Sequence, residues 1–398
     1  MSCGQTLQDH LSRPEHALAV YCSRTHLDDG TATKIETLLK NEIDWDYLFK
    51  FARRHSVLPL LYLQLKTLAP GSVPADELNR LKTFYQENLG RNLYLTGELC
   101  RILSTFSDAG VEAIPYKGPA LAISAYGNLD SRRFVDLDIM VRKADVKRAK
   151  ELLLARGYQC ETDWTEAQQT LLMRTQHNMA MRREHGRLIV ELHWEVAPDL
   201  FASSFQAEQL WERLEPMSLN NLTVKTLSGE DLLLSSCIHG SKHLWERLAW
   251  ICDVAELLRT GRDLNWADLC RRANATATDR MMFLGLCLAH CLFNAPVPDD
   301  IRSQMFADKS VSGLARRVCE GLFRGPEPVL PPLRESLSFN MHLRSTWGSR
   351  FRYCLLIFRP TDRDLGAFSF PRSLSFVYYA MRPFRMLREE RKRRLAAN

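Results

Sequence analysis

Two aspartates separated by one residue give the clearest chemical signal in the sequence. Asp136 and Asp138 alternate with apolar residues in the segment Val135–Ile139, a pattern that predicts a strand. Side chains two residues apart on a strand project from the same face, so the two carboxylates should lie side by side. A cation between them would relieve their repulsion, and carboxylate oxygens favour Mg²⁺ or Mn²⁺ over zinc. The alternative is a solvated edge strand with two surface aspartates.

A third carboxylate is predicted on a neighbouring strand. Residues 187–196 alternate so that Glu191, His193 and Glu195 share one face of that strand. Glu191 would then join the two aspartates. Three carboxylates that bind Mg²⁺ are suited to in-line phosphoryl or nucleotidyl transfer by two metal ions.

A glycine turn upstream of the aspartates predicts a phosphate site. Lys117-Gly118-Pro119 follows the apolar run Val111–Tyr116 and precedes a predicted helix, Ala120–Tyr126. Backbone amides at the start of a helix can bind phosphate oxygens, glycine permits their close approach, and the lysine adds a positive charge. Arg132 and Arg133 could neutralise a triphosphate, although surface arginines fit the pattern equally well.

A group of histidines lies further along the chain. His239 and His243 are four residues apart on a predicted helix, which is a spacing found among metal ligands. Asp253 on the next predicted helix would complete a histidine and aspartate metal site of the phosphohydrolase kind. The sequence favours two other interpretations, in which these side chains pack in the interior or Lys242 and His243 contact the substrate.

A central α/β unit must position these residues. Strands are predicted at Val135–Val141, Asn178–Arg183 and Arg187–Val196, and the last two form a hairpin. Helical periodicity dominates on both sides, and a long helix is predicted over Pro74–Ala109. The chain therefore divides into a poorly ordered lead-in (1–30), an N-terminal helical region (31–110), an α/β core (111–225), a C-terminal helical region (226–380) and a basic tail (381–398).

Composition excludes several classes of protein. Of the 398 residues, 45% are apolar and 25% are charged, as in globular proteins and unlike disordered or collagen-like chains. No apolar run is long enough to span a bilayer, and polar residues in Met1–Arg13 stand where a signal peptide would need an apolar stretch, so we expect no signal peptide. The 11 cysteines are scattered without a C-x-x-C pair, which is typical of reduced thiols. We therefore expect a soluble, cytoplasmic protein.

The net charge of +6 is concentrated at the C-terminus, where Met381–Asn398 holds seven Arg or Lys and two Glu. A basic terminal helix is most often a solvated face. The alternative is a weak contact with an anionic membrane, for which Tyr378, Tyr379, Pro383 and Phe384 would supply an aromatic anchor. Nucleic acid is a less favoured partner because the rest of the chain is almost neutral.

Together these segments resemble the polymerase-beta-type nucleotidyltransferase superfamily, and more narrowly its bacterial branch of poorly characterised nucleotidyltransferases. The resemblance begins near Asp44-Trp45, ends near Tyr378–Pro383 and so covers about nine-tenths of the chain. It is carried by Lys117-Gly118, Tyr126–Arg133, Val135–Ile139, Glu191-Leu192-His193-Trp194, Leu227–Asp231, His239, Lys242-His243, Trp250 and Asp253.

The resemblance implies an α/β (α+β) fold, in which a mixed β-sheet core of the nucleotidyltransferase type is flanked by N-terminal and C-terminal helical regions. It implies a metal-dependent enzyme that transfers an NMP moiety from an NTP to an unidentified acceptor, such as a small molecule, sugar, peptide or protein. Two Mg²⁺ or Mn²⁺ ions would be held by the catalytic carboxylates Asp136, Asp138 and Glu191. The expected nucleotide-binding residues are Lys117, Gly118, Arg132, Arg133, Lys242 and His243.

The sequence departs from the superfamily at the glycine turn. The usual turn is glycine-serine, whereas Gly118 is followed by Pro119, which has no hydroxyl group to hold a phosphate. The alternative function is therefore a catalytically degenerate nucleotide-binding or interaction protein on the same fold. The histidine and aspartate phosphohydrolase is a less favoured third possibility.

Overall fold

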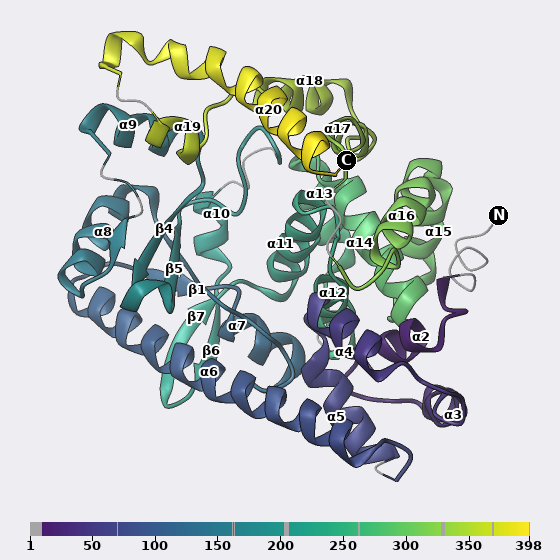
Figure 1. The fold of residues 1–398 in the computed structure, drawn as a ribbon. Coiled ribbons are helices and arrows are strands. Elements are labelled where there is room, and N and C mark those ends of the chain that lie inside the picture. Colours follow the sequence, from purple (N-terminus) through teal and green to yellow (C-terminus); the bar gives the residue numbers. More distant parts are fainter. Residues whose placement is uncertain are drawn as a thin grey trace.

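The computed structural model describes residues 10–69, 71–160, 162, 164–202, 207–261, 263–327, 331–367 and 370–397. The chain forms a small mixed sheet with helices before it and after it (Figure 1). The predicted α+β fold with flanking helical regions is confirmed.

The N-terminal helices are α2 (Pro14–Tyr21), α3 (Asp29–Leu38), α4 (Trp45–Arg54), α5 (Leu58–Leu68) and α6 (Ala75–Asp108). Asp44 begins α4 by accepting a hydrogen bond from the Tyr47 amide, and two arginines follow in its last turn. The 34-residue helix α6 runs along one edge of the molecule beneath the sheet in Figure 1. Its bounds agree with the predicted long helix.

The predicted lead-in at residues 1–30 is wrong for the part that forms α2. Leu18 and Val20 are completely buried in the helical core, and the Glu15 carboxylate accepts a hydrogen bond from the Asp44 amide. The helix has only 8 residues, too short for its apolar stripe to show a sustained period. Residues 1–9 lie outside the described residues.

The central sheet contains β1 (Ala113–Pro115), β2 (Leu137–Val141), β3 (Gln159–Cys160), β4 (Asn178–Arg183) and β5 (Leu188–His193). The strand order is β1-β2-β5-β4-β3, with β2 and β5 parallel and the other pairs antiparallel. All five residues of β2 are buried, because the strand is internal and helices cover the sheet. The predicted hairpin is confirmed as β4 and β5, joined through Glu184–Gly186.

The helices of the sheet unit are α7 (Pro119–Leu121), α8 (Val146–Ala155), α9 (Glu166–Thr175) and α10 (Ala207–Glu212). A π-helical turn, η1 (Ala122–Tyr126), continues α7. A separate two-stranded sheet is formed by β6 (Glu215–Leu219) and β7 (Leu222–Thr226), which are absent from the elements predicted above.

The C-terminal region begins with the helices α11 (Gly229–Lys242), α12 (Leu248–Arg259), α13 (Trp266–Ala275), α14 (Asp279–Phe293), α15 (Asp299–Ala307) and α16 (Lys309–Leu322). It ends with α17 (Leu333–His342), α18 (Trp347–Leu356), α19 (Asp362–Ala367) and α20 (Phe376–Ala397). The buried Trp245 ring fills the space beside Gly240, where an added Cβ would lie 2.4 Å from it. This contact fixes the end of α11, which faces the site described below.

The expected basic tail at 381–398 belongs to α20 as far as Ala397, and residue 398 lies outside the described residues; α20 begins at Phe376 and crosses the top of the molecule in Figure 1. Arg385 pairs with the buried carboxylate of Asp364, and Tyr378 is buried with only 1% of its surface exposed. The first three turns of α20 are therefore anchored to the body of the protein. None of the described helices combines the length and the apolar character needed to cross a bilayer.

Candidate active site

The parallel pairing of β2 and β5 brings the predicted carboxylates together. Asp138 lies opposite Glu191 in the register of the two strands, and Asp136 lies directly before β2. All three side chains line a cavity of about 380 Å³. The alternative of a solvated edge strand is wrong, because β2 is internal and Asp138 is only 5% exposed.

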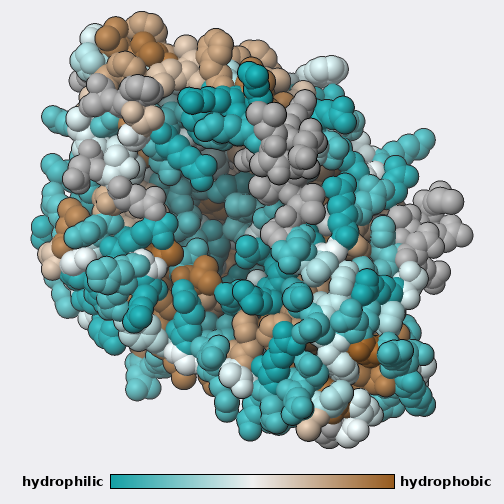
Figure 2. Space-filling model, viewed as in Figure 1, coloured by the Kyte–Doolittle hydropathy of each residue, from teal (hydrophilic) through white to brown (hydrophobic). Residues whose placement is uncertain are grey.

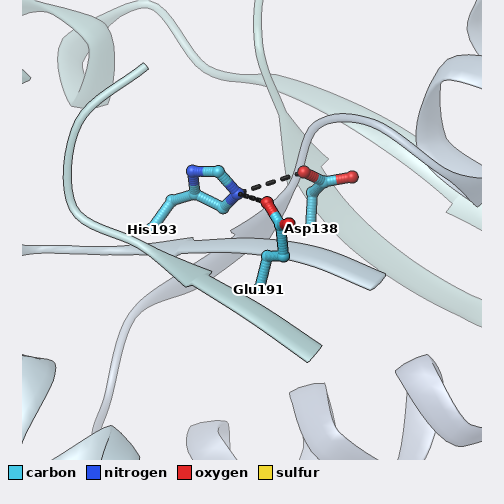
Figure 3. Close-up of side chains that lie close together, drawn as sticks. All are labelled: Asp138, Glu191 and His193. Carbon is cyan, nitrogen blue, oxygen red and sulfur yellow. Dashed lines mark hydrogen bonds and ion pairs between the residues drawn. The ribbon is translucent and has the colours of Figure 1, made fainter. Parts of the chain in front are cut away.

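His193 joins two of these carboxylates. Its Nε2 lies 3.0 Å from Asp138 Oδ1 and 3.2 Å from Glu191 Oε2, and Figure 3 shows the three side chains converging. Its Nδ1 lies 3.0 Å from the Tyr116 hydroxyl. The sequence analysis placed His193 on the same face as Glu191 but gave it no role. Its position two residues after Glu191, on the same face of the strand, was the pattern that could have placed it beside the carboxylates.

Lys117 also binds Asp138, with 2.8 Å between Nζ and Oδ1. Burial alone would lower the pKa of Lys117, but Asp138, Tyr116 and Glu191 together raise it. Gly118 has a φ of +51°, and a Cβ there would lie 3.2 Å from the Asp136 carbonyl oxygen. Only glycine therefore allows this turn to pack against the aspartate segment.

The glycine turn offers fewer free amides than the sequence analysis expected. The amides of Ala120, Leu121 and Ala122 donate to the carbonyls of Lys117 and Gly118, and Pro119 has no N–H group. The helix that follows is one short α-helical segment continued by a π-helical turn. A phosphate bound here would depend on side chains rather than on a row of helix amides.

The three carboxylates differ in how well their charges are compensated. Burial raises the pKa of Asp138, but Lys117 and His193 outweigh it and hold this pKa far below its usual value. Burial also raises the pKa of Glu191, but the hydrogen bond to His193 outweighs it, and the pKa is lowered overall. Among the described residues no side chain pairs with Asp136 in this way, and burial, Asp138 and Glu191 outweigh the more distant Lys117 and Arg132 and raise its pKa to about 6. Uncompensated negative charge therefore gathers around Asp136.

Arg132 lies at this cavity but is held by another group. Its Nε and one terminal nitrogen donate to the two oxygens of Asp253 at 2.8 and 3.0 Å, and Tyr126 donates to the same carboxylate. Asp253 is thus occupied by Arg132 rather than paired with the histidines of α11. In the described part of the chain, Asp253, His239 and His243 do not bring their ligand atoms close enough together to hold a metal ion. The geometry does not support the phosphohydrolase alternative.

Arg133 has very different surroundings from Arg132. Burial lowers the pKa of Arg133, and the neighbouring Arg247, Arg91 and Arg53 lower it further. Among the described residues, neither Arg133 nor Arg247 has a carboxylate within ion-pair distance, although Glu246 lines the same cavity. We call Arg53, Arg133 and Arg247 the arginine cluster. The three arginines also line an adjoining cavity of about 490 Å³.

His239 and Lys242 of α11, with His243 directly after the helix, form a further wall of the cavity that contains the carboxylates. Lys242 Nζ lies 3.1 Å from His177 Nε2, and burial and Lys117 lower the Lys242 pKa to about 8. The rings of His239 and His243 pack on Trp250, with centroids 5.3 and 5.2 Å from it. Burial lowers the pKa of both histidines, so they are neutral at pH 7.

A third and larger cavity of about 780 Å³ meets the smaller cavity, the one that contains the carboxylates, at Asn178, Glu191 and Lys242. Its far wall comes from the C-terminal helices and includes Tyr353 of α18 and Arg382 of α20. Figure 2 shows this face of the molecule hollowed between the sheet and the C-terminal helices. The sequence analysis did not predict this cavity, because its walls lie far apart along the chain.

The described residues contain one cluster of side chains that could hold a metal ion, formed by Asp138, Glu191 and His193. Comparison with family models gives a match to the uncharacterised nucleotidyltransferases over residues 41–294, which is more than half of the chain. No curated protein and no solved structure matches the chain. The match spans the sheet, the carboxylates, the arginine cluster and α11, and the chain belongs to this family of uncharacterised nucleotidyltransferases.

Proposed function

We propose that this protein is a metal-dependent nucleotidyltransferase that passes an NMP moiety from an NTP to an acceptor bound in the larger cavity. One observation carries the proposal: two cavities meet at Glu191, and the smaller one contains all three carboxylates. A transferase needs a donor site and an acceptor site that share one reacting position. The family match supports a nucleotide as the donor.

The smaller cavity suits the triphosphate of the donor. Arg133 and Arg247 bring positive charge to this cavity without a paired carboxylate in the described structure, and Lys117 adds a further cation. Ser56, which lines the same cavity, supplies a hydroxyl group from a different element than the expected glycine-serine turn. We therefore assign triphosphate binding to Arg133, Arg247 and Lys117, with His243 and Lys242 on the opposite wall.

The carboxylates suit a divalent metal. Burial, Asp138 and Glu191 raise the pKa of Asp136 although Lys117 and Arg132 oppose them, so the protein's own cations only partly neutralise this charge, and oxygen ligands match Mg²⁺ or Mn²⁺. Asp136, Asp138 and Glu191 would hold two such ions. When bound, the metal would neutralise charge that develops on the phosphate oxygens during transfer. His193 and Lys117 would keep Asp138 ionised and fixed in place.

The acceptor would approach from the larger cavity. Its nucleophilic oxygen would form a bond to the α-phosphorus while the bond from that phosphorus to the bridging oxygen breaks, so that pyrophosphate leaves. The proton of the acceptor would pass to Glu191, which lines both cavities and is ionised because His193 lowers its pKa. Asn178 Nδ2 lies 2.9 Å from Glu191 Oε2 and would orient this carboxylate.

Incubation with each α-labelled NTP, Mg²⁺ and a cell lysate tests the proposal. We expect label on a lysate component or on the protein, and its loss when EDTA is added. The matched control is the variant with Asp136→Asn and Asp138→Asn. Transfer of label that persists in this variant would refute the assignment of the site.

The catalytically degenerate alternative makes a separate prediction. Calorimetry with a non-hydrolysable NTP and Mg²⁺ would detect binding of both for an enzyme. A protein that binds neither would be an interaction module on the same fold. A protein that binds nucleotide but transfers no label with any lysate would support a nucleotide-binding protein without activity.

A further inference from the structure

The C-terminal helices expose an unusual number of large apolar side chains. On α18, Trp347, Phe351 and Leu355 are 81%, 66% and 43% exposed, and Phe358 just after the helix is 50% exposed. These positions are spaced by four, four and three residues, so they lie on one face of the helix. The opposite face contains Tyr353, which is buried and lines the larger cavity.

Helix α20 repeats this arrangement. Phe376, Tyr379, Phe384 and Leu387 are 65%, 39%, 72% and 62% exposed and share one face at helical spacing. Arg385 on the other face is bound to Asp364. Figure 2 shows hydrophobic side chains gathered at the top of the view, where Figure 1 places α20. Isolated exposed apolar residues are common, but two such stripes in neighbouring segments mark an interaction surface.

Basic residues accompany both stripes. Residues 343–398 contain thirteen Arg or Lys against four Asp or Glu, so this segment carries more than the whole net charge of +6. In the described part of the segment, Arg352, Arg388, Arg391 and Lys392 have no carboxylate within ion-pair distance. The cations are therefore available to an external anion.

The structure corrects the expected aromatic anchor. Tyr378 belongs to the core, where its hydroxyl accepts a hydrogen bond from the Phe370 amide, so it cannot serve as an anchor. Arg382 and Arg385 are also occupied, by the Arg359 carbonyl and by Asp364. The available surface consists instead of the stripes on α18 and α20, and α18 was absent from the sequence-based expectation.

We propose that these two stripes bind the surface of an anionic lipid bilayer. Apolar helix faces flanked by Arg and Lys are the pattern of helices that lie in a membrane interface, with Trp and Phe entering the headgroup region. Charge complementarity selects this occupant. A second copy of the chain would bring an equally positive segment against the first, and like charges would repel. The surface lies on the opposite side of α18 from the cavity, so it is independent of nucleotide transfer.

Co-sedimentation of the full chain with vesicles tests this proposal. Vesicles of phosphatidylcholine with about 30% phosphatidylglycerol should bind the protein at low salt, and phosphatidylcholine alone should not. Replacing Arg388, Arg391 and Lys392 together with Gln should weaken binding about tenfold or more. The matched control replaces Lys40, Lys66 and Lys82, which are exposed in the N-terminal helical region, and should bind as the wild type does.

The apolar stripes need a separate variant. Trp347→Ser with Phe351→Ser and Phe384→Ser should weaken binding to the anionic vesicles about tenfold or more, because the interfacial apolar area is lost. The control is Leu154→Ser with Phe306→Ser, at positions 44% and 40% exposed elsewhere on the surface. Tryptophan fluorescence gives a second readout that needs no serine variant. The fluorescence of the wild type should shift to the blue with anionic vesicles, and Trp347→Phe should remove most of the shift.

Four results would overturn the proposal. Equal binding to neutral and anionic vesicles, or binding to neither, would contradict a charge-selected membrane surface. Dimerisation in light scattering that the serine variants abolish, without vesicle binding, would identify a second copy as the occupant. Stronger retention by RNA than by anionic vesicles would make nucleic acid the partner.

Discussion

Arg132 and Arg133 are neighbours in the sequence but belong to two regions with opposite electrostatics. Arg132 lies in a compensated region, where Asp253 accepts both of its hydrogen bonds. Arg133 lies in the arginine cluster, where other arginines lower its pKa and none of the described carboxylates pairs with it. A buried charge without a partner costs stability, so a fold retains it where a ligand will compensate it. The arginine cluster is therefore the better candidate for contact with a triphosphate.

The same contrast divides the carboxylates. Asp138 is bound by Lys117 and His193, whereas Asp136 is left with a raised pKa of about 6. By this reasoning Asp136 marks where an external cation is needed, and Asp138 has a structural role in addition to its proposed metal contact. The following predictions test the division between compensated and uncompensated charges.

The largest effect is expected from Asp136→Asn combined with Asp138→Asn. Removal of both proposed metal ligands should lower the rate of label transfer on the order of 10³-fold or more. The rate is measured with α-labelled NTP and Mg²⁺. A circular dichroism spectrum like that of the wild type would show that the loss is chemical, and retained activity would remove these residues from the active site.

Arg132→Met and Arg133→Met should have opposite consequences. The first leaves the Asp253 carboxylate buried without its partner and should lower the free energy of unfolding by about 3–5 kcal/mol. The second relieves repulsion among arginines and should leave stability unchanged or slightly higher. Its effect should be on NTP affinity, which should fall about tenfold.

Urea unfolding and calorimetry with a non-hydrolysable NTP give the two readouts for this pair. A large loss of stability in Arg133→Met, with unchanged nucleotide affinity, would break the distinction between the two arginines.

Glu191→Gln should lower the transfer rate on the order of 10²-fold, because the variant keeps the size of the side chain but loses a metal ligand and base. Glu195→Gln is the matched control on the same predicted face, and it should reduce the rate less than about threefold because it lies beyond the end of β5. Steady-state rates of label transfer, measured for both variants, compare the two positions. Equal losses at both positions would place the reacting centre elsewhere.

The smallest effect concerns stability without metal. At pH 8 in EDTA, Asp136→Asn should raise the free energy of unfolding by about 1–2 kcal/mol, because it removes a charge that the folded state disfavours. The raised pKa means that wild-type stability is greatest where Asp136 is protonated and falls as the pH rises through about 6. The gap between variant and wild type should therefore close below about pH 4. Urea titrations at several pH values measure the gap, and a constant gap would contradict the proposed charge state.

Local patterns predicted the parts of the molecule that depend on a few consecutive residues. The alternation around Asp136 and Asp138 predicted β2, and the turn at Glu184–Gly186 predicted the hairpin that places Glu191. The parallel pairing of β2 with β5 places Asp138 beside Glu191, as expected for carboxylates on neighbouring strands. These features follow from strand geometry alone.

Contacts between distant segments were not predictable in this way. The arginine cluster combines Arg53 of α4, Arg133 before β2 and Arg247 before α12, and no local pattern connects them. His193 gained its partners only when Tyr116 and Asp138 were brought beside it by the sheet. Phe384 is exposed for a reason that also lies in distant contacts. The ion pair between Arg385 and Asp364 holds one face of α20 against the protein, and Phe384, on the other face, is left 72% exposed.

The larger cavity has walls of two origins. The wall with His177, Asn178 and Glu191 belongs to the segment that matches the family, residues 41–294, whereas the wall with Tyr353 and Arg382 lies beyond it. Under the proposed function, the chemistry of transfer and the choice of acceptor would therefore be encoded in separable stretches of the gene. Exchange of the C-terminal helices between family members should change which molecule is modified while leaving the preference for the nucleotide intact.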